Sequence, residues 1–518
     1  MLFYNKSVKL QSGSTSKLSY TNFSTINSVT DENILPLRYA KIAYNFINEN
    51  GALKTGYGFE LLSLPYAKDD PDTRAVYLPV GSANPHKIWC FKYYDNSLYV
   101  KDYKIVVLDK DGCLYIIDLY SSNSYMKKID NVTLSTDSVA VNFNLNGEDV
   151  LIISSPDGSM GYINGASEYV SCETTENQPD ILDMAIHYER LFAVGVKQPR
   201  RLYFSDDLDP TNWNISLDDA GFIDFSDERG DLKRVFSFNN YLYVLREYGI
   251  SKVSAFGDQE QFYTSHCYTA NTKIYEKTAC LCGDVLIFLA RDGLYSFDGI
   301  NINKISINID NMFGDNTHAN SCFYNGKYYL ACKINYNDNE TMGCEGVIPY
   351  YNNTMLCLDI QTGNMCLTRG IDLKQMLPLE EGNLSEMLCL YDSNKSYVLG
   401  KLNKLGKFFG ESTLKKWYSP LTDLGYGNKR KLVKEIYLRT KYDCYIYVKT
   451  ESSSKRIKVY GSAGVTRVPV NVIGTLIAID FESEIGNAEI SNPQIIIDLL
   501  GALWKLKKKL LLLTEQLN

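Results

Sequence analysis

The stretch GDVLIFLARDGLYSFDG, residues 283–299, decides the fold predicted for this chain. Its segment VLIFLA is apolar and favours a β-strand, and RDG favours a tight turn. LYSF favours a second short strand, and the following DG favours another turn. The stretch therefore predicts one β-hairpin.

Five further stretches have the same order of strand, turn and strand. They are KIVVLDKDGCLYIIDL from residue 104, DVLIISSPDGSMGYING from 149, RLFAVGVKQPRRLYFSD from 190, YLYVLREYGISKVSAFG from 241 and TMLCLDIQTGNMCLTRG from 354. Turn glycines Gly112 and Gly158 are 46 residues apart, and Gly249 and Gly293 are 44 apart. A propeller blade has about 40 to 50 residues. Because an isolated hairpin cannot bury its faces, such units stack. The sequence predicts an all-β fold with a β-propeller of six or seven blades. The alternative is a β-sandwich or barrel with ordinary hairpins.

Four regions are predicted along the chain. Residues 1–50, rich in Ser, Thr and Asn, form an N-terminal arm, and residues 51–405 form the propeller. After a lysine-rich stretch, apolar and polar residues alternate again, which predicts a small β-sandwich over residues 416–498. Residues 499–518 form a C-terminal amphipathic helix. The polar stretch 335–353 is expected to be an exposed insertion within the propeller.

The last region carries leucines at steps of three and four, the a/d pattern of a coiled coil. This predicts an oligomerisation helix, with a helix docked on its own domain as the alternative. Four lysines argue against a membrane span, and no segment of the chain reaches the roughly 18 uncharged apolar residues of one. The leucines are Leu499, Leu503, Leu506, Leu510, Leu513 and Leu517.

Composition excludes several classes of protein. The formal net charge is −8 and no broad basic stripe is evident, so the chain lacks the electrostatic footprint of a protein that grips duplex nucleic acid. Forty tyrosines favour half-buried strand faces and contact surfaces. The 13 cysteines lack zinc-finger spacing and are expected to be buried thiols in a reducing compartment. The N-terminus lacks the apolar run of a signal peptide, so synthesis in the cytoplasm is expected.

Catalytic motifs are missing from the sequence. The four histidines show no metal-ligand spacing, and there is no nucleophile elbow, phosphate loop or dinucleotide fingerprint. We therefore expect no enzyme, no metal and no cofactor.

The stretch SDDLDPTNW resembles the Asp box of sialidase-like propellers, which is a structural turn away from their active site. Its matching residues are Ser205, Asp207, Asp209, Thr211 and Trp213. Asp209 and Pro210 occupy the position of the box's Gly, and the spacing is one residue longer than the pattern. A propeller glycan-binding protein or sialidase-like glycosidase is the alternative function. It would need two carboxylates facing one sugar, and a sialidase would also need a cluster of arginines.

Three phrases between residues 183 and 299 resemble a known family. They are RLYFSD followed by DPTNW, NYLYVL followed by GI, and DGLYSFDG. They resemble the β-propeller virion proteins of tailed bacteriophages, the tail-hub, nozzle and packaged-DNA-stabilisation proteins of short-tailed phages. KTGYGF from residue 54 and KKWYSPLTDLG from residue 415 also look similar, so the resemblance covers about residues 48–490. The leucine-rich C-terminal region and the N-terminal arm depart from the family pattern.

The resemblance implies a structural, non-enzymatic protein of the virion tail or neck, made in the cytoplasm of the bacterial host. Copies would form a ring, of six or twelve, around the DNA channel and contact the portal or adaptor and other tail proteins. The ring would retain packaged DNA and guide its ejection, with duplex DNA passing through without sequence-specific binding. The acidic balance of the chain agrees with this role, because like charge leaves DNA mobile.

Overall fold

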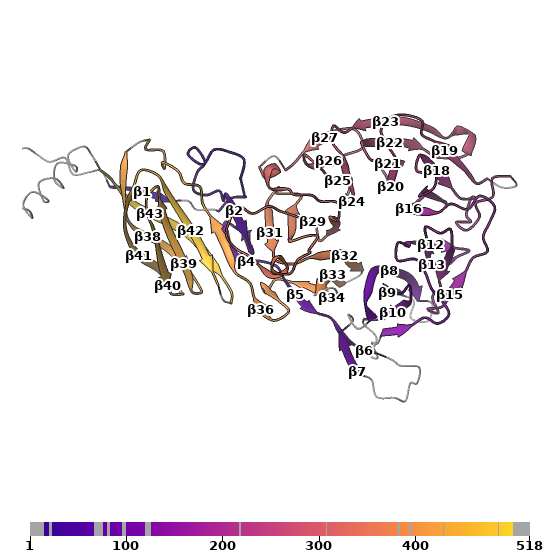
Figure 1. The fold of residues 1–518 in the computed structure, drawn as a ribbon, viewed down its shortest axis with the longest axis horizontal. Helices are drawn as coiled ribbons and strands as arrows, with labels where there is room; N and C mark the ends of the chain where they lie inside the picture. The colour runs from indigo at the N-terminus through magenta and orange to yellow at the C-terminus, as the bar shows by residue number, and fades with distance from the viewer. Residues whose placement is uncertain are drawn as a thin grey trace, which may run out of the picture. The chain divides into compact units, whose positions relative to one another are not determined.

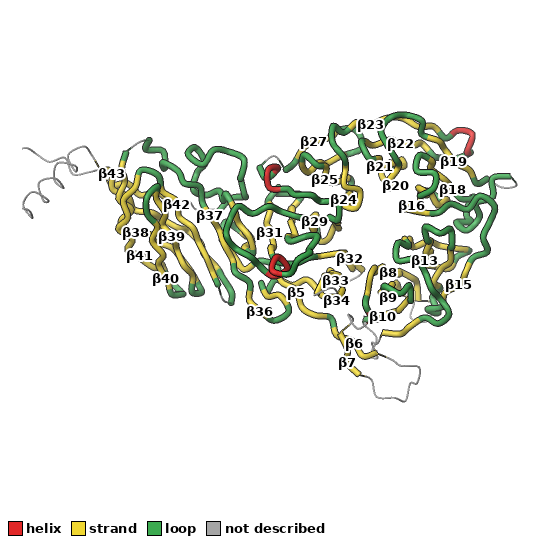
Figure 2. The backbone as a smooth tube through the Cα atoms, in the orientation of Figure 1, coloured by secondary structure: helices red, strands yellow, loops and turns green. Residues whose placement is uncertain are grey.

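The computed structural model describes residues 15–19, 23–66, 76–79, 83–95, 100–119, 126–216, 219–306, 308–381, 384–393, 396–427, 429–484 and 486–500. Regular structure in these residues is β, apart from short 3-10 turns, shown red in Figure 2. These turns are η2 Gln259–Gln261, η3 Asp310–Met312 and η4 Gly343–Gly346.

The chain divides into two compact units. The first, here called the sandwich unit, comprises Met1–Gly58, Asn364–Thr368 and Asn403–Asn518. The second, here called the ring unit, comprises Phe59–Gly363 and Arg369–Leu402.

Seven small sheets make the ring visible in Figure 1. Each blade is numbered along the chain, and its first strand is the innermost. Blade one contains β8 Pro85–Asp95, β9 Val100–Asp109, β10 Leu114–Ile117 and β11 Met126–Lys128, with β6 Ser63–Tyr66 and β7 Val76–Pro79 at the edge. Blade two contains β12 Val139–Leu145, β13 Glu148–Ser154, β14 Met160–Ile163 and β15 Tyr169–Ser171. Blade three contains β16 Ile181–His187, β17 Arg190–Gly195, β18 Arg201–Phe204 and β19 Gly221–Asp224.

The remaining blades follow the same antiparallel order. Blade four contains β20 Leu232–Phe238, β21 Tyr241–Arg246, β22 Gly249–Ser254 and β23 Tyr263–Thr269. Blade five contains β24 Ile274–Cys282, β25 Val285–Ala290, β26 Gly293–Phe297 and β27 Ile302–Lys304. Blade six contains β28 Asn320–Tyr324, β29 Lys327–Cys332, β30 Thr354–Asp359 and β31 Met365–Arg369. Blade seven contains β32 Leu373–Glu381, β33 Leu384–Ser393, β34 Ser396–Asn403 and β5 Gly58–Leu61. The hairpin of β35 Lys407–Phe408 and β36 Glu411–Ser412 belongs to the sandwich unit.

Apolar cores lie between neighbouring blades. Phe192 and Leu202 of blade three pack in one cluster with Val235 and Leu242 of blade four. Blades one and two, two and three, and four and five share clusters of the same kind. A further cluster joins blade seven to blade one. The sheets therefore bury both faces against their neighbours and close into a β-propeller-like ring.

Consecutive strands β5 and β6 connect the two ends of the ring. β5 adds to blade seven beside β34, and the amide of Leu62 donates to the carbonyl oxygen of Leu399 at 2.9 Å. β6 then lies parallel to β11 of blade one. One stretch of backbone thus belongs to the last blade and continues directly into the first.

The sandwich unit has two sheets. The first contains β1 Thr15–Ser19, β3 Phe46–Glu49, β4 Ala52–Thr55, β43 Glu489–Leu500, β38 Arg430–Thr440 and β41 Val465–Gly474. The second contains β2 Ile42–Tyr44, β37 Lys415–Tyr418, β42 Ile477–Ser483, β39 Cys444–Thr450 and β40 Ser454–Val459. Figure 1 shows the sheets facing each other. Ile436 and Ile495 of one sheet are fully buried, as are Ile446 and Phe481 of the other.

The predicted arm over residues 1–50 is wrong for its described part. β1 pairs with β43, β2 pairs with β37, and β3 joins β4 in the first sheet. Composition suggested an arm because the partner strands of β1 and β2 lie more than 350 residues later in the sequence. The predicted start of the propeller at residue 51 is too early, because β4 belongs to the sandwich unit and the ring unit begins at Phe59.

The predicted helix over residues 499–518 is wrong at its start. β43 extends to Leu500, and Leu499 pairs with Lys431 of β38. Ile495 and Ile497 are buried and Ile496 is less so, which is the period of a strand rather than of a helix. Residues 501–518 lie outside the described residues.

Candidate interaction site on the ring

Polar side chains on the innermost strands bridge neighbouring blades. Asn142 Nδ2 of β12 donates to the carbonyl oxygen of Cys90 in β8 at 2.9 Å. Arg234 Nη1 of β20 donates to the carbonyl oxygen of Ala279 in β24 at 2.8 Å, and Arg234 Nε lies 3.5 Å from Asp183 Oδ2 of β16. These groups satisfy backbone and charge partners at the blade junctions.

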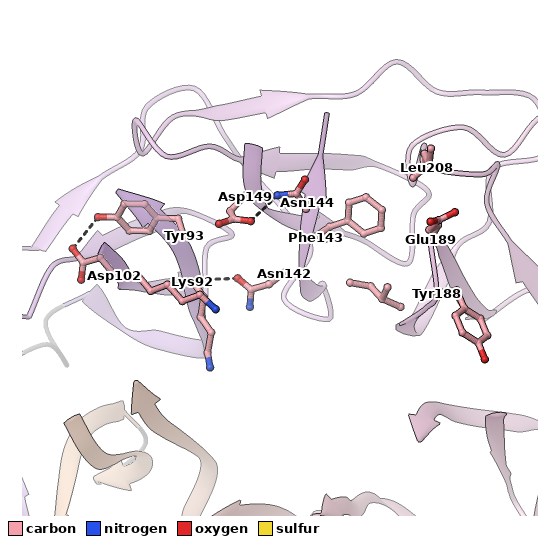
Figure 3. Close-up of a pocket in the computed structure, with 12 residues that line it drawn as sticks. Lys92, Tyr93, Asp102, Asn142, Phe143, Asn144, Asp149, Tyr188, Glu189 and Leu208 are labelled. Carbon is pink, nitrogen blue, oxygen red and sulfur yellow. Dashed lines mark hydrogen bonds between the residues drawn. The ribbon is translucent and has the colours of Figure 1, made fainter. Parts of the chain in front are cut away.

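A cleft of about 490 Å³ lies at one face of the ring, at the turns that join the first and second strands of blades one to three. Figure 3 shows Tyr93 and Asp102 at one end, Phe143 between, and Tyr188 and Leu208 at the other end. The remaining lining residues are Lys92, Lys101, Asn142, Asn144, Asp149, Ile186 and Glu189.

Carboxylates in the cleft differ in their contacts. Asp102 Oδ2 accepts from Tyr93 Oη at 3.1 Å, and Asp149 Oδ1 accepts from Asn144 Nδ2 at 2.9 Å. The carboxylate of Glu189 has no hydrogen bond or ion pair within the described part of the chain. Glu189 is therefore the acidic group of the cleft that is open to a binding partner.

Tyr188 occupies a turn position that its counterparts fill with Asn or Gly. Its φ is 53°, in the left-handed region. The first turn residues of blades two, four, five and six have φ values of 52°, 50°, 66° and 48°, and are Asn146, Asn239, Gly283 and Asn325. Asn and Gly adopt this conformation readily, whereas a bulky side chain costs about 1–2 kcal/mol. Blade three thus keeps a tyrosine where the backbone disfavours one.

Leu208 has the same conformation beside it. Its φ is 60°, and its amide donates to the carbonyl oxygen of Glu189 at 3.1 Å. Tyr188, Leu208 and Phe256 are 49%, 62% and 70% exposed. The rings of Tyr188 and Phe256 meet edge to face with centroids 5.2 Å apart. We call these three residues the apolar patch.

His187 lies next to the patch but lacks the geometry of a catalytic base. Its Nδ1 is 2.8 Å from Ser237 Oγ, while its buried Nε2 has no hydrogen-bond partner among the described residues. Burial lowers the pKa of His187 to about 4, so the ring is neutral at pH 7. In a catalytic triad a carboxylate orients the imidazole, whereas among the described residues the side chain hydrogen-bonded to this ring is Ser237.

The six arginines between residues 190 and 246 are the candidates for a sialidase-type cluster, and each has a local contact. Arg190 Nη1 donates to the carbonyl oxygens of Ser205 and Asp219 at 3.1 and 2.8 Å. The other candidates pair with a nearby carboxylate. These pairs are Arg200 with Asp231, Arg201 with Asp224, Arg229 and Arg246 with Asp227, and Arg234 with Asp183. They do not form one cluster facing a common substrate carboxylate.

The Asp-box-like residues form the corner between β18 and β19. Ser205 is fully buried, and its Oγ accepts from the amide of Leu191 at 3.0 Å. Asp209 Oδ1 accepts from both the amide and Oγ1 of Thr211, at 2.9 and 2.7 Å. Trp213 is 2% exposed and packs between blades two and three, whereas the side chain of Asp207 is exposed.

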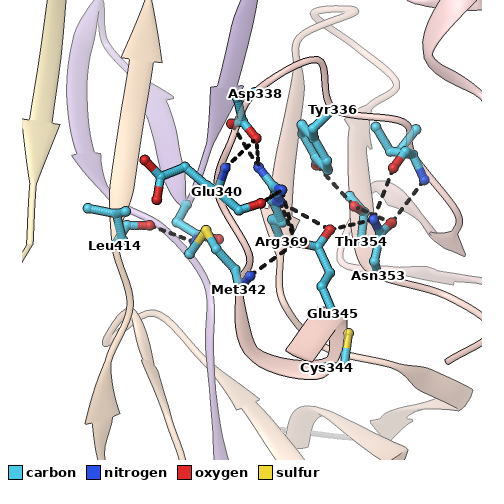
Figure 4. Close-up of polar contacts among 12 residues, drawn as sticks. Tyr336, Asp338, Glu340, Met342, Cys344, Glu345, Asn353, Thr354, Arg369 and Leu414 are labelled. Atoms are coloured by element: carbon cyan, nitrogen blue, oxygen red, sulfur yellow. Dashed lines mark hydrogen bonds and ion pairs between the residues drawn. The ribbon is translucent and has the colours of Figure 1, made fainter. Parts of the chain in front are cut away.

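A buried ionic cluster anchors the insertion between β29 and β30. Arg369 Nη1 donates to both oxygens of Asp338 at 3.0 and 2.9 Å, and Arg369 Nη2 lies 2.9 Å from Glu345 Oε2. Tyr336 stacks on the guanidinium at 4.0 Å (Figure 4). Much of the insertion is exposed, as expected, but the charged side chains of this cluster are almost completely buried. A polar composition failed to reveal this because the charges are satisfied internally.

The predicted oligomerisation leucines are only partly described. Leu499 is in β43, and Leu503, Leu506, Leu510, Leu513 and Leu517 lie outside the described residues. Within the described residues, no group of three or more His, Cys, Asp and Glu is arranged to hold a metal ion. No helix in the described part of the chain is long and apolar enough to cross a membrane.

Comparison with known proteins gives similarity of structure only. No protein-family model and no curated protein sequence matches the chain. A catalytically inactive virginiamycin B lyase from Staphylococcus aureus, solved with quinupristin, aligns with a TM-score of 0.40 and 8% identity, over 67% of this chain and 99% of the lyase. Raptor from Chaetomium thermophilum aligns with a TM-score of 0.40 and 10% identity, over 67% of this chain and 29% of Raptor. At these values neither likeness carries an argument about function.

Proposed function

We propose that this chain is a structural, non-enzymatic protein of a tailed-bacteriophage virion, a tail-hub, nozzle or neck component. In this proposal, copies form a ring around the DNA channel that retains packaged DNA and guides its ejection. The observation that carries the proposal is the set of phrases in blades three to five that resemble those of short-tailed phage propeller proteins. They occupy β18 and the corner after it, β21 with β22, and β26 with its flanking turns.

The contacts of the ring support a scaffold role. Charged and amide side chains of the innermost strands are bonded across blade junctions, as Asn142 and Arg234 show. The candidate arginines are bonded locally, and His187 has no orienting partner on Nε2. Side chains bonded across the blade junctions suit a protein that bears load.

The second candidate is a glycan-binding propeller or sialidase-like glycosidase. The cleft favours binding of this kind, since the exposed ring of Tyr188 lies beside the unpaired carboxylate of Glu189. Aromatic faces stack on the apolar faces of sugars, and carboxylates accept their hydroxyl hydrogens. Hydrolysis has weaker support, because Asp102 and Asp149 already accept hydrogen bonds from their neighbours.

Disruption of the gene in the genome that carries it tests the proposal. We expect the chain in purified virions by mass spectrometry, and gene-disrupted particles that package DNA and then lose it. Purified infectious virions that lack the chain would contradict the proposal. Binding of soluble oligosaccharides, abolished by Tyr188→Ala, would favour the second candidate.

A further inference from the structure

We propose that the apolar patch is a docking site for the leucine- and lysine-rich C-terminal segment, residues 501–518, of a second copy of this chain. The inference rests on the proposed assembly of copies and names the surface that would receive the segment.

Tyr188 and Leu208 both hold a left-handed backbone that bulky residues disfavour. The same turn in blades two, four, five and six is made with Asn or Gly. Both side chains are nevertheless exposed and line the same end of the cleft. The Tyr188 ring packs on His187, with centroids 4.4 Å apart, yet about half of its surface stays exposed. Contact with a partner gives the most direct reason for bulky, exposed side chains at these two positions.

Apolar contact area extends from the patch into the cleft. Phe143 lines the cleft beyond Tyr188 and Leu208 and is itself nearly buried. Phe256, on the other side of Tyr188, is among the most exposed apolar residues described. Aromatic residues around a recess are the anchors typical of protein interfaces.

Charge around the patch selects a basic partner. Within two positions of the three patch residues, the charged residues other than Arg190 are acidic, namely Glu189, Asp206, Asp207, Asp209 and Asp258. Arg190 is buried and donates to backbone carbonyl oxygens. The carboxylates of Glu189 and Asp207 have no partner within the described residues. The exposed charges next to the patch are therefore negative, whereas Lys92 and Lys101 line the other end of the cleft.

The segment 501–518, GALWKLKKKLLLLTEQLN, has the complementary chemistry. It carries seven leucines, Trp504, four lysines and one glutamate, so its side chains sum to 4 − 1 = +3. It follows directly after Leu500, the last residue of β43. Leucines for the patch and ammonium groups for the negative charges next to it are thus adjacent in one segment.

Carbodiimide coupling of the full-length chain tests the docking directly, because it joins only ammonium and carboxylate groups in contact. Equal amounts of ¹⁴N-labelled and ¹⁵N-labelled chain are mixed, coupled, digested and analysed by mass spectrometry. We expect mixed-isotope links from Lys505, Lys507, Lys508 or Lys509 to Glu189, Asp207 or Asp258. Links within one isotope alone, or links spread over unrelated carboxylates, would overturn the proposal.

Full-length variants separate docking from folding. Tyr188→Asn and Leu208→Asn install a residue suited to the left-handed backbone, so both are expected to fold. Each should lower the yield of mixed-isotope links about tenfold or more. The matched control is Ile300→Asn, because Ile300 is 85% exposed in another turn. Unchanged yield in the patch variants, or equal loss in the control, would overturn the proposal. Virion incorporation is measured independently, so failure of docking and failure of the proposed function remain distinguishable.

Discussion

Gln375 of blade seven and Ile88 of blade one hold the ends of the ring together. Gln375 Nε2 donates to the carbonyl oxygen of Ile88 at 2.6 Å, and Gln375 Oε1 accepts from the amide of Ile88 at 2.9 Å. These residues are 287 positions apart in the sequence. One side-chain amide thus supplies both the donor and the acceptor that the backbone of a fully buried residue requires.

Replacing Gln375 by Leu should destabilise the ring unit. The buried amide and carbonyl of Ile88 would lose their partners, at a cost of about 2–4 kcal/mol in the free energy of unfolding. Urea unfolding measures the loss. Gln361→Leu is the control, because Gln361 is in an exposed turn of blade six and should change stability little. A loss in Gln375→Leu no larger than in the control would contradict the bridging role.

Replacing Arg369 by Met should release the insertion between β29 and β30. Asp338 and Glu345 would remain buried without their cation, which costs about 3–5 kcal/mol. Limited proteolysis should then cut within residues 335–353 under conditions where the parent chain resists. Arg291→Met, at an exposed position, is the control. Resistance of the Arg369→Met insertion would show that other contacts hold it.

Acid should lower the free energy of unfolding of the ring unit through His187. Its pKa is lowered to about 4 in the folded chain, against about 6.5 for an unfolded histidine. Below pH 6.5 the unfolded chain gains a proton that the folded chain refuses, so stability falls until about pH 4, by roughly 3 kcal/mol. His187→Asn should remove this part of the slope, as measured by urea unfolding between pH 7 and 4. His266→Asn should keep it, since His266 is exposed.

Tyr188→Asn should stabilise the folded chain. Asn adopts the left-handed backbone of this turn at lower cost, which predicts a gain of about 1 kcal/mol in the free energy of unfolding. Asn239→Tyr, the reverse change in the matching turn of blade four, should lose a similar amount. A loss of stability in Tyr188→Asn would mean that the aromatic side chain of Tyr188 contributes packing to the fold. The case for an exposed binding side chain would then fail.

The sequence predicted those strands whose two faces are both buried. Five of the six quoted hairpins are the second and third strands of a blade, and the hairpin from Thr354 is the third and fourth. The innermost strands were not predicted, because polar residues such as Lys87 and Asn142 interrupt their apolar pattern. These two side chains form hydrogen bonds across the blade junctions. β1 escaped because its partner, β43, is at the other end of the chain.

The candidate site was missed although its signal was present in the sequence. Comparing the first turns of the blades sets Tyr188 against Asn146, Asn239 and Asn325. A tyrosine where other repeats have a turn former marks a residue kept for its side chain. The proximity of Leu208 and Phe256 was not readable in this way, because both come from loops of irregular length whose positions depend on the closed ring.

Substitutions of the C-terminal leucines test the assembly hypothesis. Leu503→Asp with Leu510→Asp should abolish assembly and leave the β-sheets folded, as circular dichroism and native mass would show. A shortened chain has to keep residues 494–500, because Ile495 and Ile497 of β43 are fully buried in the sandwich unit. The matched truncation therefore ends at Leu500.

Native mass spectrometry of the full-length chain beside the chain ending at Leu500 tests the central claim most directly. The account predicts a closed ring of six or twelve copies for the full-length chain and dissociation to monomers for the shortened one. A strict monomer in both, at concentrations well above those used for the coupling experiment, would contradict a self-assembling virion ring.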